Sequence, residues 1–342
     1  VLYGAENKEQ IFIRLADHDY RAYETTPYHK GYDDNNGALR GGLGFGVPQE
    51  MVDLYFMKDG RRIVDDENYE EYEGVPSNVH LGWSTDYKDA VVSTRTYFKA
   101  NSNKTLKQWA DREPRFYANI TFNGSTWLKT DTPRAELTFN GNSGYANANW
   151  DAPYTGYGMR KMAPKEGRSG ANRHCATLLR LADMYLGYAE TLSACDQRDE
   201  AIKYVNKIRA RAGIPGYGVA GTTDDKGFAC IPYEDTRDEV DKRIRRERLI
   251  ELMFEWNHFF DVRRWKVANM AVGDDWIYPN YHRGGEGGAI HGMAFRSDAP
   301  AFFEKVVVET RTFLPKHYLF PIPDEDVRRN PKMVQNLGWT TE

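Results

Sequence analysis

Residues 64–107 combine aromatic rings with polar side chains in a pattern that suits carbohydrate binding. The rings of this stretch are Tyr69, Tyr72, Trp83, Tyr87, Tyr97 and Phe98. An exposed ring can stack on the apolar face of a sugar, while neighbouring Asn, Asp and Lys side chains bond to its hydroxyls. The same rings could instead pin a long loop to the core, and the sequence leaves both interpretations open. A smaller segment of the same kind, 276–281, is the weaker candidate.

Glu255 and His258 have the Glu-x-x-His spacing of a metal-binding helix, with Glu251 one turn earlier. A di-iron bundle needs a second such pair and two further inward carboxylates. The sequence contains no second Glu-x-x-His. We therefore expect these residues to form structural pairs, with no metal site and no cofactor.

The glycine-rich run 41–46, Gly-Gly-Leu-Gly-Phe-Gly, invites comparison with phosphate-binding loops. It lacks both the G-x-G-x-x-G pattern and the G-K-[ST] ending, so we expect a flexible loop. The sequence also lacks the G-x-S-x-G elbow and the His-Glu-x-x-His zinc motif. Carboxylate pairs that hydrolyse glycosidic bonds are set in space rather than by sequence spacing, so a glycoside hydrolase stays an alternative.

Composition excludes several classes of protein. The 342 residues carry 46 Lys and Arg against 50 Asp and Glu, a net charge of −4, so no nucleic-acid partner is expected. No apolar run is long enough to span a bilayer. Three cysteines match neither a metal site nor a disulfide framework. The chain begins at Val1 without a signal peptide, so we expect a processed or truncated start that has lost any membrane anchor.

The elements that would position these residues divide the chain near residue 173. The first part is rich in Gly, Asn, Asp and aromatics, with strand-like alternation at 10–14 and 117–122 and a short helical pattern at 48–57. Beyond it the period becomes helical. Apolar residues from Leu178 to Leu192 share one face, and a second helix ends at Gly213 before Pro215. The short connection predicts an antiparallel helical hairpin, whose other face needs further helices.

A third helix is predicted to begin at the capping box 236–239 and to continue to Trp265. Its second half is apolar nearly all round, so it should be buried. It nevertheless carries many charged residues, and a buried charge without a partner costs several kcal/mol, at roughly 3–5. We therefore expect arginine–carboxylate pairs that clamp this helix to its neighbours.

Five ordered motifs together resemble the SusD/RagB family of bacterial outer-membrane glycan-binding lipoproteins. They are 55–60 (YFMKDG), 111–116 (DREPRF, with Glu113 where the family has Asp), the hairpin segments 181–192 and 205–213, the segment 244–265, and the ending 319–323 with 330–331 and 335–339. The resemblance implies a predominantly α, SusD-like fold in which a tetratricopeptide-like helical scaffold joins a long, irregular region with short strands. It implies one domain, 1–342, lacking its N-terminal part, with a ligand-facing region 1–173 and a scaffold with the family ending at 174–342.

The resemblance also implies function. Such proteins are cell-surface lipoproteins of the outer membrane in Bacteroidetes, held by an N-terminal lipid anchor that is absent from this chain. They bind oligosaccharides for polysaccharide utilisation and hand them to a SusC-like TonB-dependent transporter, without catalysis. The family's sugar-binding residues follow no fixed motif, and in relatives the ligand lies among loops. We therefore expect glycan contacts from Trp83 and Tyr87, then from Tyr69, Tyr72 and Asn78.

Two alternatives accompany this interpretation. A surface glycoside hydrolase would release product from an oligosaccharide, and a purely structural transporter subunit would have no glycan affinity. Because the resemblance leaves the scaffold without its first helices, residues 1–342 alone are expected to unfold at low temperature or to aggregate.

Overall fold

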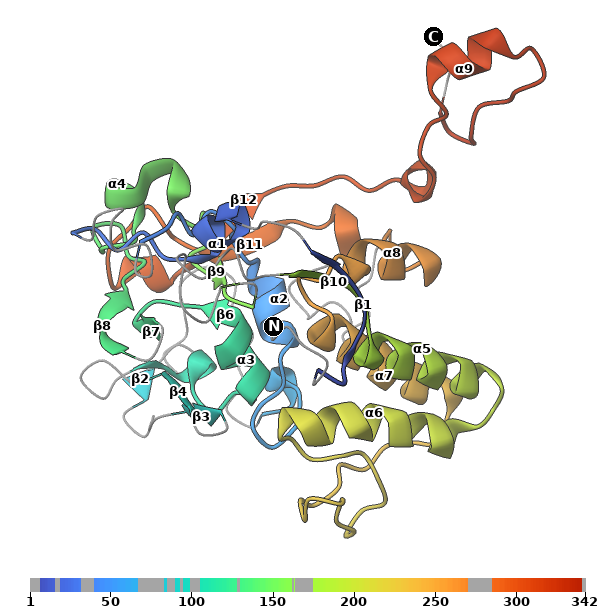
Figure 1. The fold of residues 1–342 in the computed structure, drawn as a ribbon, viewed down its shortest axis with the longest axis horizontal. Helices are drawn as coiled ribbons and strands as arrows, with labels where there is room; N and C mark the ends of the chain where they lie inside the picture. Colours follow the sequence, from blue (N-terminus) through green and yellow to red (C-terminus); the bar gives the residue numbers. More distant parts are fainter. Residues whose placement is uncertain are drawn as a thin grey trace.

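The computed structural model describes residues 7–15, 19–31, 40–66, 83–84, 90–92, 95–98, 105–127, 130–161, 163, 175–269 and 285–339. Its helices are α1 Asp19–Thr25, α2 Gln49–Leu54, α3 Pro114–Asn119, α4 Tyr145–Ala148, α5 Leu181–Ala194, α6 Arg198–Ala212, α7 Arg237–Glu251, α8 Asn257–Arg264 and α9 Asp324–Arg329. The long helices α5, α6 and α7 lie side by side at one end of the molecule, and short strands gather with α3 and α4 at the other (Figure 1). This arrangement confirms the predominantly helical fold class with a loop-rich region.

The helical hairpin has the predicted form. Helix α5 packs against α6, and α6 ends at Gly213 in the left-handed conformation, with φ of 79°. One expectation was wrong: Leu178 belongs to strand β10, Cys175–Arg180, and the helix begins only at Leu181. The side chains of Leu178, Met184 and Tyr188 are exposed. That further helices cover this face stays a prediction.

The third helix begins as predicted but is broken near its middle. The Thr236 hydroxyl accepts the Glu239 N–H, which caps α7. Helix α7 ends at Glu251, and α8 begins at Asn257 after a turn in which Phe254 and Trp256 take φ of 67° and 70°. The single helix predicted to reach Trp265 was therefore wrong. The burial expected of its second half is also wrong in part, because Trp256, Phe259 and Phe260 are exposed. Lys161 and Arg180 donate to the Glu251 carbonyl from outside the helix. Side-chain donors from distant segments thus take the place of the backbone N–H that would bond to this carbonyl if the helix continued.

Within the described residues the strands pair only as two-stranded antiparallel ribbons. They are β1 Gln10–Leu15 with β10, β2 Trp83–Ser84 with β5 Thr105–Leu106, β3 Ala90–Val92 with β4 Arg95–Phe98, β6 Ile120–Thr121 with β9 Gly158–Met159, β7 Ser125–Trp127 with β8 Thr130–Ala135, and β11 Ile290–Met293 with β12 Lys305–Glu309. The strand expected at 10–14 is confirmed as β1. The strand expected at 117–122 is wrong at its start, because Pro114 occupies the first turn of a helix that continues to Asn119.

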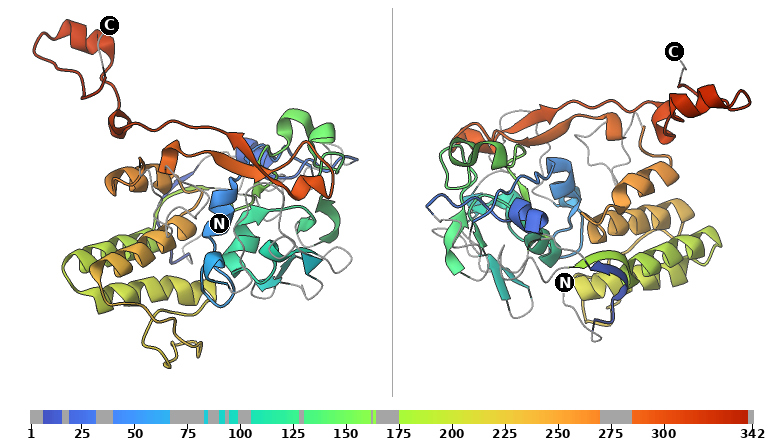
Figure 2. Two further views of the ribbon diagram at one scale, coloured as in Figure 1. Left: turned by 180° about the vertical axis from the view of Figure 1, so that it is seen from behind. Right: turned by 45° about the horizontal axis from the view of Figure 1, so that its top comes forward.

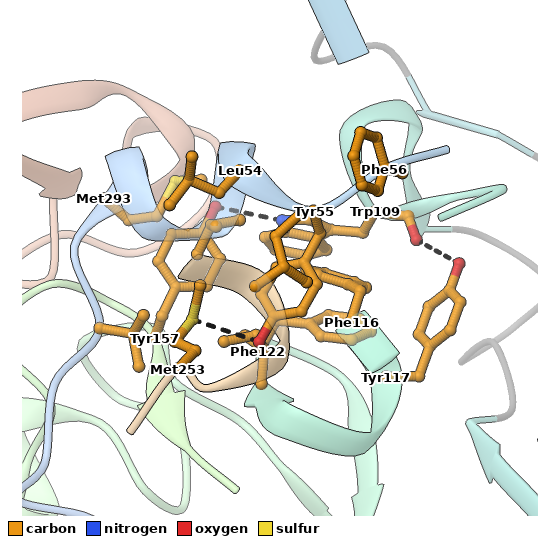
Figure 3. Close-up of a cluster of buried hydrophobic side chains, with 14 of the residues drawn as sticks. Leu54, Tyr55, Phe56, Trp109, Phe116, Tyr117, Phe122, Tyr157, Met253 and Met293 are labelled. Atoms are coloured by element: carbon orange, nitrogen blue, oxygen red, sulfur yellow. Dashed lines mark hydrogen bonds between the residues drawn. The ribbon is translucent and has the colours of Figure 1, made fainter. Parts of the chain in front are cut away.

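One aromatic core joins the two ends of the molecule (Figure 3). Trp109 contacts Phe122 with its ring tilted by 45° and donates its indole N–H to the Tyr157 hydroxyl at 3.1 Å. Tyr55, at the end of α2, packs edge-on against Phe116 and hydrogen-bonds the Met253 sulfur at 3.2 Å. Since Met253 follows α7, this core ties the strand-rich end to the helical end.

The C-terminal segment leaves the body as an arm that carries α9 (Figures 1 and 2). The arm closes on itself. The Gln335 amide bonds both to the N–H and to the carbonyl of Ile322, and the Trp339 indole N–H donates to the Lys316 carbonyl. Of the helices that the structure describes, none combines the length and the hydropathy required to cross a bilayer.

Candidate functional site

The predicted glycan-binding residues fall in the least described part of the chain. Trp83 begins strand β2, and the structure describes its backbone. Tyr69, Tyr72, Asn78 and Tyr87 lie outside the described residues, as does most of the stretch around them. The weaker candidate at 276–281 also lies outside them. The role of all these residues stays a prediction.

The backbone of Trp83 is anchored to the core. Strand β2 pairs with β5 so that Trp83 lies opposite Leu106 and Ser84 opposite Thr105. Thr105 and Leu106 are buried, with exposed fractions of 3% and 1%, and the chain continues from them into the buried ring of Trp109. The position of Trp83 therefore depends on the same core that holds the helices.

The neighbouring ribbons gather around α3. Strands β3 and β4 pack against α3, and β4 also packs against β7. Figure 1 shows β2, β3 and β4 together beside this helix. Helix α3 is thus the support of the predicted site, and its own attachment to the scaffold decides where the site lies.

Arg115 of α3 makes that attachment. Its Nε donates to Glu113 at 2.7 Å, and its Nη1 donates to Glu247 at 2.7 Å and to Glu251 at 3.1 Å. Glu247 and Glu251 belong to α7, so Arg115 joins the strand-rich end to the helical end. Burial raises the pKa of Glu113, the positive charge of Arg115 opposes that rise, and the negative charge of Glu247 adds to it.

The same charged centre collects four of the five family-like motifs. Glu113, from the segment 111–116, accepts the Phe56 N–H of the segment 55–60 at 2.9 Å. Arg209, from the hairpin segment 205–213, donates to the Gly60 carbonyl at 2.8 Å and to Glu247 at 3.2 Å. Glu247 lies in the segment 244–265. The motifs therefore build a buried structural junction, with Glu113 supplying the carboxylate where the family has Asp.

A second part of the centre confirms the expected pairing of Glu255. Arg180 donates to both Glu255 oxygens, at 2.7 and 2.8 Å, and Lys161 approaches the same carboxylate at 2.5 Å. Burial alone would raise the pKa of Glu255, but Lys161 and Arg180 hold it below its ordinary value. His258 bonds instead to Glu286 at 2.8 Å. Over the described ranges, His, Cys, Asp and Glu side chains form no group of three that could hold a metal ion.

One buried carboxyl differs from the others. Asp53 on α2 accepts a hydrogen bond from Gln49 at 3.0 Å, and its Oδ2 has no hydrogen-bond partner. Burial raises the pKa of Asp53 to about 7, against the opposing charge of Arg112 and the Gln49 hydrogen bond. A carboxyl with this pKa could act as a general acid in an open cleft. Asp53 is closed off from solvent, so its effect is on stability.

Trp150 is an exposed aromatic residue that the sequence did not single out. Trp150 lies on a surface turn after α4 with 79% of its area exposed. The signal in the sequence is the run Asn147-Ala-Asn149-Trp150-Asp151, a ring between turn-forming polar residues. This run is short and contains one ring, whereas residues 64–107 contain six.

Known proteins match this chain along most of its length. The sequence model of the SusD family matches residues 8–339. The curated SusD-like protein P2 of Formosa agariphila is 28% identical over 181 residues, which are 53% of this chain and 28% of that protein.

Solved structures have the same fold. A SusD-like protein (BF3747) from Bacteroides fragilis NCTC 9343 has a TM-score of 0.61 at 24% identity, covering 98% of this chain and 55% of its own. The structure named BT4246 has a TM-score of 0.67 at 23% identity, covering 98% of this chain and 51% of its own. This chain thus spans about half the length of the solved structures it matches.

Proposed function

The chain belongs to the SusD family, and from this membership we propose that it binds oligosaccharide or polysaccharide chains at the cell surface and delivers them to a SusC-like, TonB-dependent transporter. The observation that carries the proposal is the family match over residues 8–339. The proposed location is the outer face of the outer membrane, where a lipoprotein of this family would meet both the glycan and the transporter.

We place the glycan among the rings of residues 64–107. Trp83 and Tyr87 are the first candidates for stacking, and Tyr69, Tyr72 and Asn78 are the second. The anchoring of Trp83 supports this choice, because β2 is paired with a buried strand next to Trp109. A backbone position held in this way loses little conformational entropy when a ligand binds to it.

The carboxylates of the charged centre are not placed for hydrolysis. Glycoside hydrolysis needs two carboxyl groups on either side of a bound sugar. The carboxylates of the charged centre, Glu113, Glu247 and Glu251, are buried and held by Arg115. They are therefore occupied in joining α3 to α7, and the proposed role is binding without catalysis.

Native gels cast with polysaccharides test the proposal. The panel contains amylopectin, xylan, pectin, mucin glycans, laminarin and α-mannan, and we expect at least one of them to retard the protein. Retardation without release of soluble sugar after prolonged incubation supports a binding protein. Release of sugar would instead identify a hydrolase, and capture of the transporter without retardation in any gel would identify a structural subunit.

A further inference from the structure

Trp150 is a strongly exposed aromatic side chain. Its exposed fraction is 79%, and among the described side chains between residues 22 and 163 it is the one large hydrophobic group that is exposed. It lies in a 3-10 turn, Asn149–Asp151, that directly follows α4. Single exposed apolar side chains are common on protein surfaces, so the case for a role rests on how this turn is held.

The backbone just before Trp150 is strained. Asn149 takes φ of 51° and ψ of −116°, a combination outside the ordinary left-handed region. The Asn149 carbonyl accepts the Ala152 N–H at 3.1 Å, which closes the turn around Trp150. Strained residues of this kind persist where the surrounding structure enforces them, and they concentrate at ligand-binding positions.

The glycine-rich run 41–46 is part of what enforces the turn. A Cβ on Gly42 would lie 2.6 Å from the Tyr23 ring and 3.2 Å from Oδ1 of Asp151. Tyr23 in turn donates its hydroxyl to Oδ2 of Asp151 at 2.9 Å. The run is therefore a closely packed segment, with Gly42 and Leu43 buried, rather than the flexible loop expected from the sequence. Its glycines let the backbone pass close to the residue that follows Trp150.

The base of the turn is also fixed. The Asn147 amide donates to the Gly141 carbonyl at 2.8 Å, and its oxygen accepts from Lys30 at 2.8 Å. At the start of α4, Tyr145 packs edge-on against Tyr154 and Phe295. Trp150 is thus presented by a rigid support, which reduces the entropy lost when a ligand binds.

The surroundings of Trp150 match a sugar. A pyranose ring has an apolar face and a rim of hydroxyl groups, so it is complemented by one aromatic ring with amides and carboxylates beside it. Asn149 and Asp151 flank Trp150 directly. A protein partner would require a continuous apolar core around the ring. At the helical end Trp256, Phe259 and Phe260 are all exposed within five residues of sequence, and the rings of Phe259 and Phe260 contact each other at 5.2 Å.

We propose that Trp150 is a glycan-stacking platform, with the exposed side chain of Asn149 next to it in the chain to bond the hydroxyls of the sugar that covers the ring. This inference rests on the proposed function, because it assigns a second contact to the same glycan-binding activity. Figures 1 and 2 place α4 at the strand-rich end, away from α5, α6 and α7. The turn after α4 lies apart from strand β2, which carries Trp83 (Figure 1).

The test uses the polysaccharide of the panel above that retards the wild-type chain most. Its dissociation constant is measured by affinity electrophoresis for Trp150→Ala, Trp150→Phe and the matched control Trp256→Ala. Losing a stacked ring at a binding hot spot should raise the constant about tenfold. Trp150→Phe should restore most of the affinity, because a smaller ring can still stack, and Trp256→Ala should bind as the wild type does.

The outcomes separate the platform from the proposed function. Equal affinity of Trp150→Ala and the wild type would overturn the platform and leave glycan binding intact. An equal loss in Trp256→Ala would also overturn it, because the effect would not be specific to this turn. Failure of every polysaccharide in the panel to retard the wild type would overturn both. Urea unfolding of each variant checks the fold, and an exposed ring should be removable without a shift in the midpoint.

Discussion

Arg115 donates from Nη1 to Oε1 of Glu247 across 2.7 Å, and this contact joins α3 to α7 inside the molecule. Arg115 has 12% of its side chain exposed and Glu247 has none. A buried charge without a partner of opposite sign destabilises the folded state, so Arg115 and Glu247 stabilise each other. The contact explains why the motif residues around Arg115 and Glu247 serve the fold: they fix the ribbons of the predicted binding region to the helical scaffold.

Arg115→Ala should therefore destabilise the protein strongly. Removing one partner leaves Glu113 and Glu247 buried without their main counter-charge, which costs about 3–5 kcal/mol. Lys58→Ala is the matched control, because Lys58 and Asp111 form a pair of similar length, 2.8 Å, with both side chains mostly exposed. That control should change the free energy of unfolding by less than about 1 kcal/mol. Urea denaturation measures both, and equal effects would show that the buried junction adds no stability.

Asp53 should make stability fall between weakly acidic and neutral pH. Its pKa is raised to about 7 by burial, whereas in the unfolded chain it returns to the ordinary value. Between these two values the folded state holds a proton that the unfolded state has released, so the free energy of unfolding decreases as pH rises. Three pH units of such a difference amount to about 4 kcal/mol.

Asp53→Asn removes the group that binds this proton and keeps an oxygen that can accept the hydrogen bond from Gln49. The variant should be more stable than the wild type at pH 8, and its unfolding free energy should vary less between pH 5 and pH 8. Asp111→Asn, at an exposed carboxylate, serves as control and should follow the wild-type profile. Parallel profiles for Asp53→Asn and the wild type would contradict the assignment of the pH dependence to Asp53.

The long helices were predictable because local signals agree with the tertiary structure there. The capping box at Thr236 and the glycine at 213 both mark real helix ends. The break between α7 and α8 has no such signal, since no Gly or Pro lies between Leu249 and Trp265. It depends on Arg180 and Lys161, which bond to the Glu251 carbonyl from segments 71 and 90 residues away in sequence. Local periodicity contains no information on such donors.

The candidate site was predictable only in outline. A density of rings in a polar stretch points to Trp83 and its neighbours, but of the five candidate glycan contacts the structure describes only the backbone of Trp83, in β2. Trp150 was not predictable in this way, because a single ring in a short turn does not indicate from the sequence whether it is exposed or buried. Its exposure depends on the approach of Gly42 and Tyr23 to Asp151, which joins segments more than 100 residues apart.

Two glycines of the hairpin should respond to alanine in opposite directions. Gly213 ends α6 with φ of 79°, and a Cβ there would meet only Pro114 at 3.8 Å, so Gly213→Ala tests the backbone alone. It should cost about 1 kcal/mol. Gly187 lies inside α5 with open space around it, so Gly187→Ala should stabilise by about 0.5–1 kcal/mol. Thermal unfolding measures the pair, and destabilisation by both would imply close packing around Gly187.

Trp83→Ala should weaken glycan binding by about 1–3 kcal/mol, if its ring stacks on the sugar as proposed. Strand β2 is only two residues long and is held by its pairing with Leu106 and Thr105, so losing the side chain should leave the fold intact. Affinity electrophoresis on the retarding polysaccharide gives the binding change, and urea unfolding gives the stability. Trp83→Phe should bind nearly as the wild type does, because it keeps a stacking ring. Unchanged affinity of Trp83→Ala would remove Trp83 from the site, whereas equal losses of affinity and stability would assign its ring to the core instead.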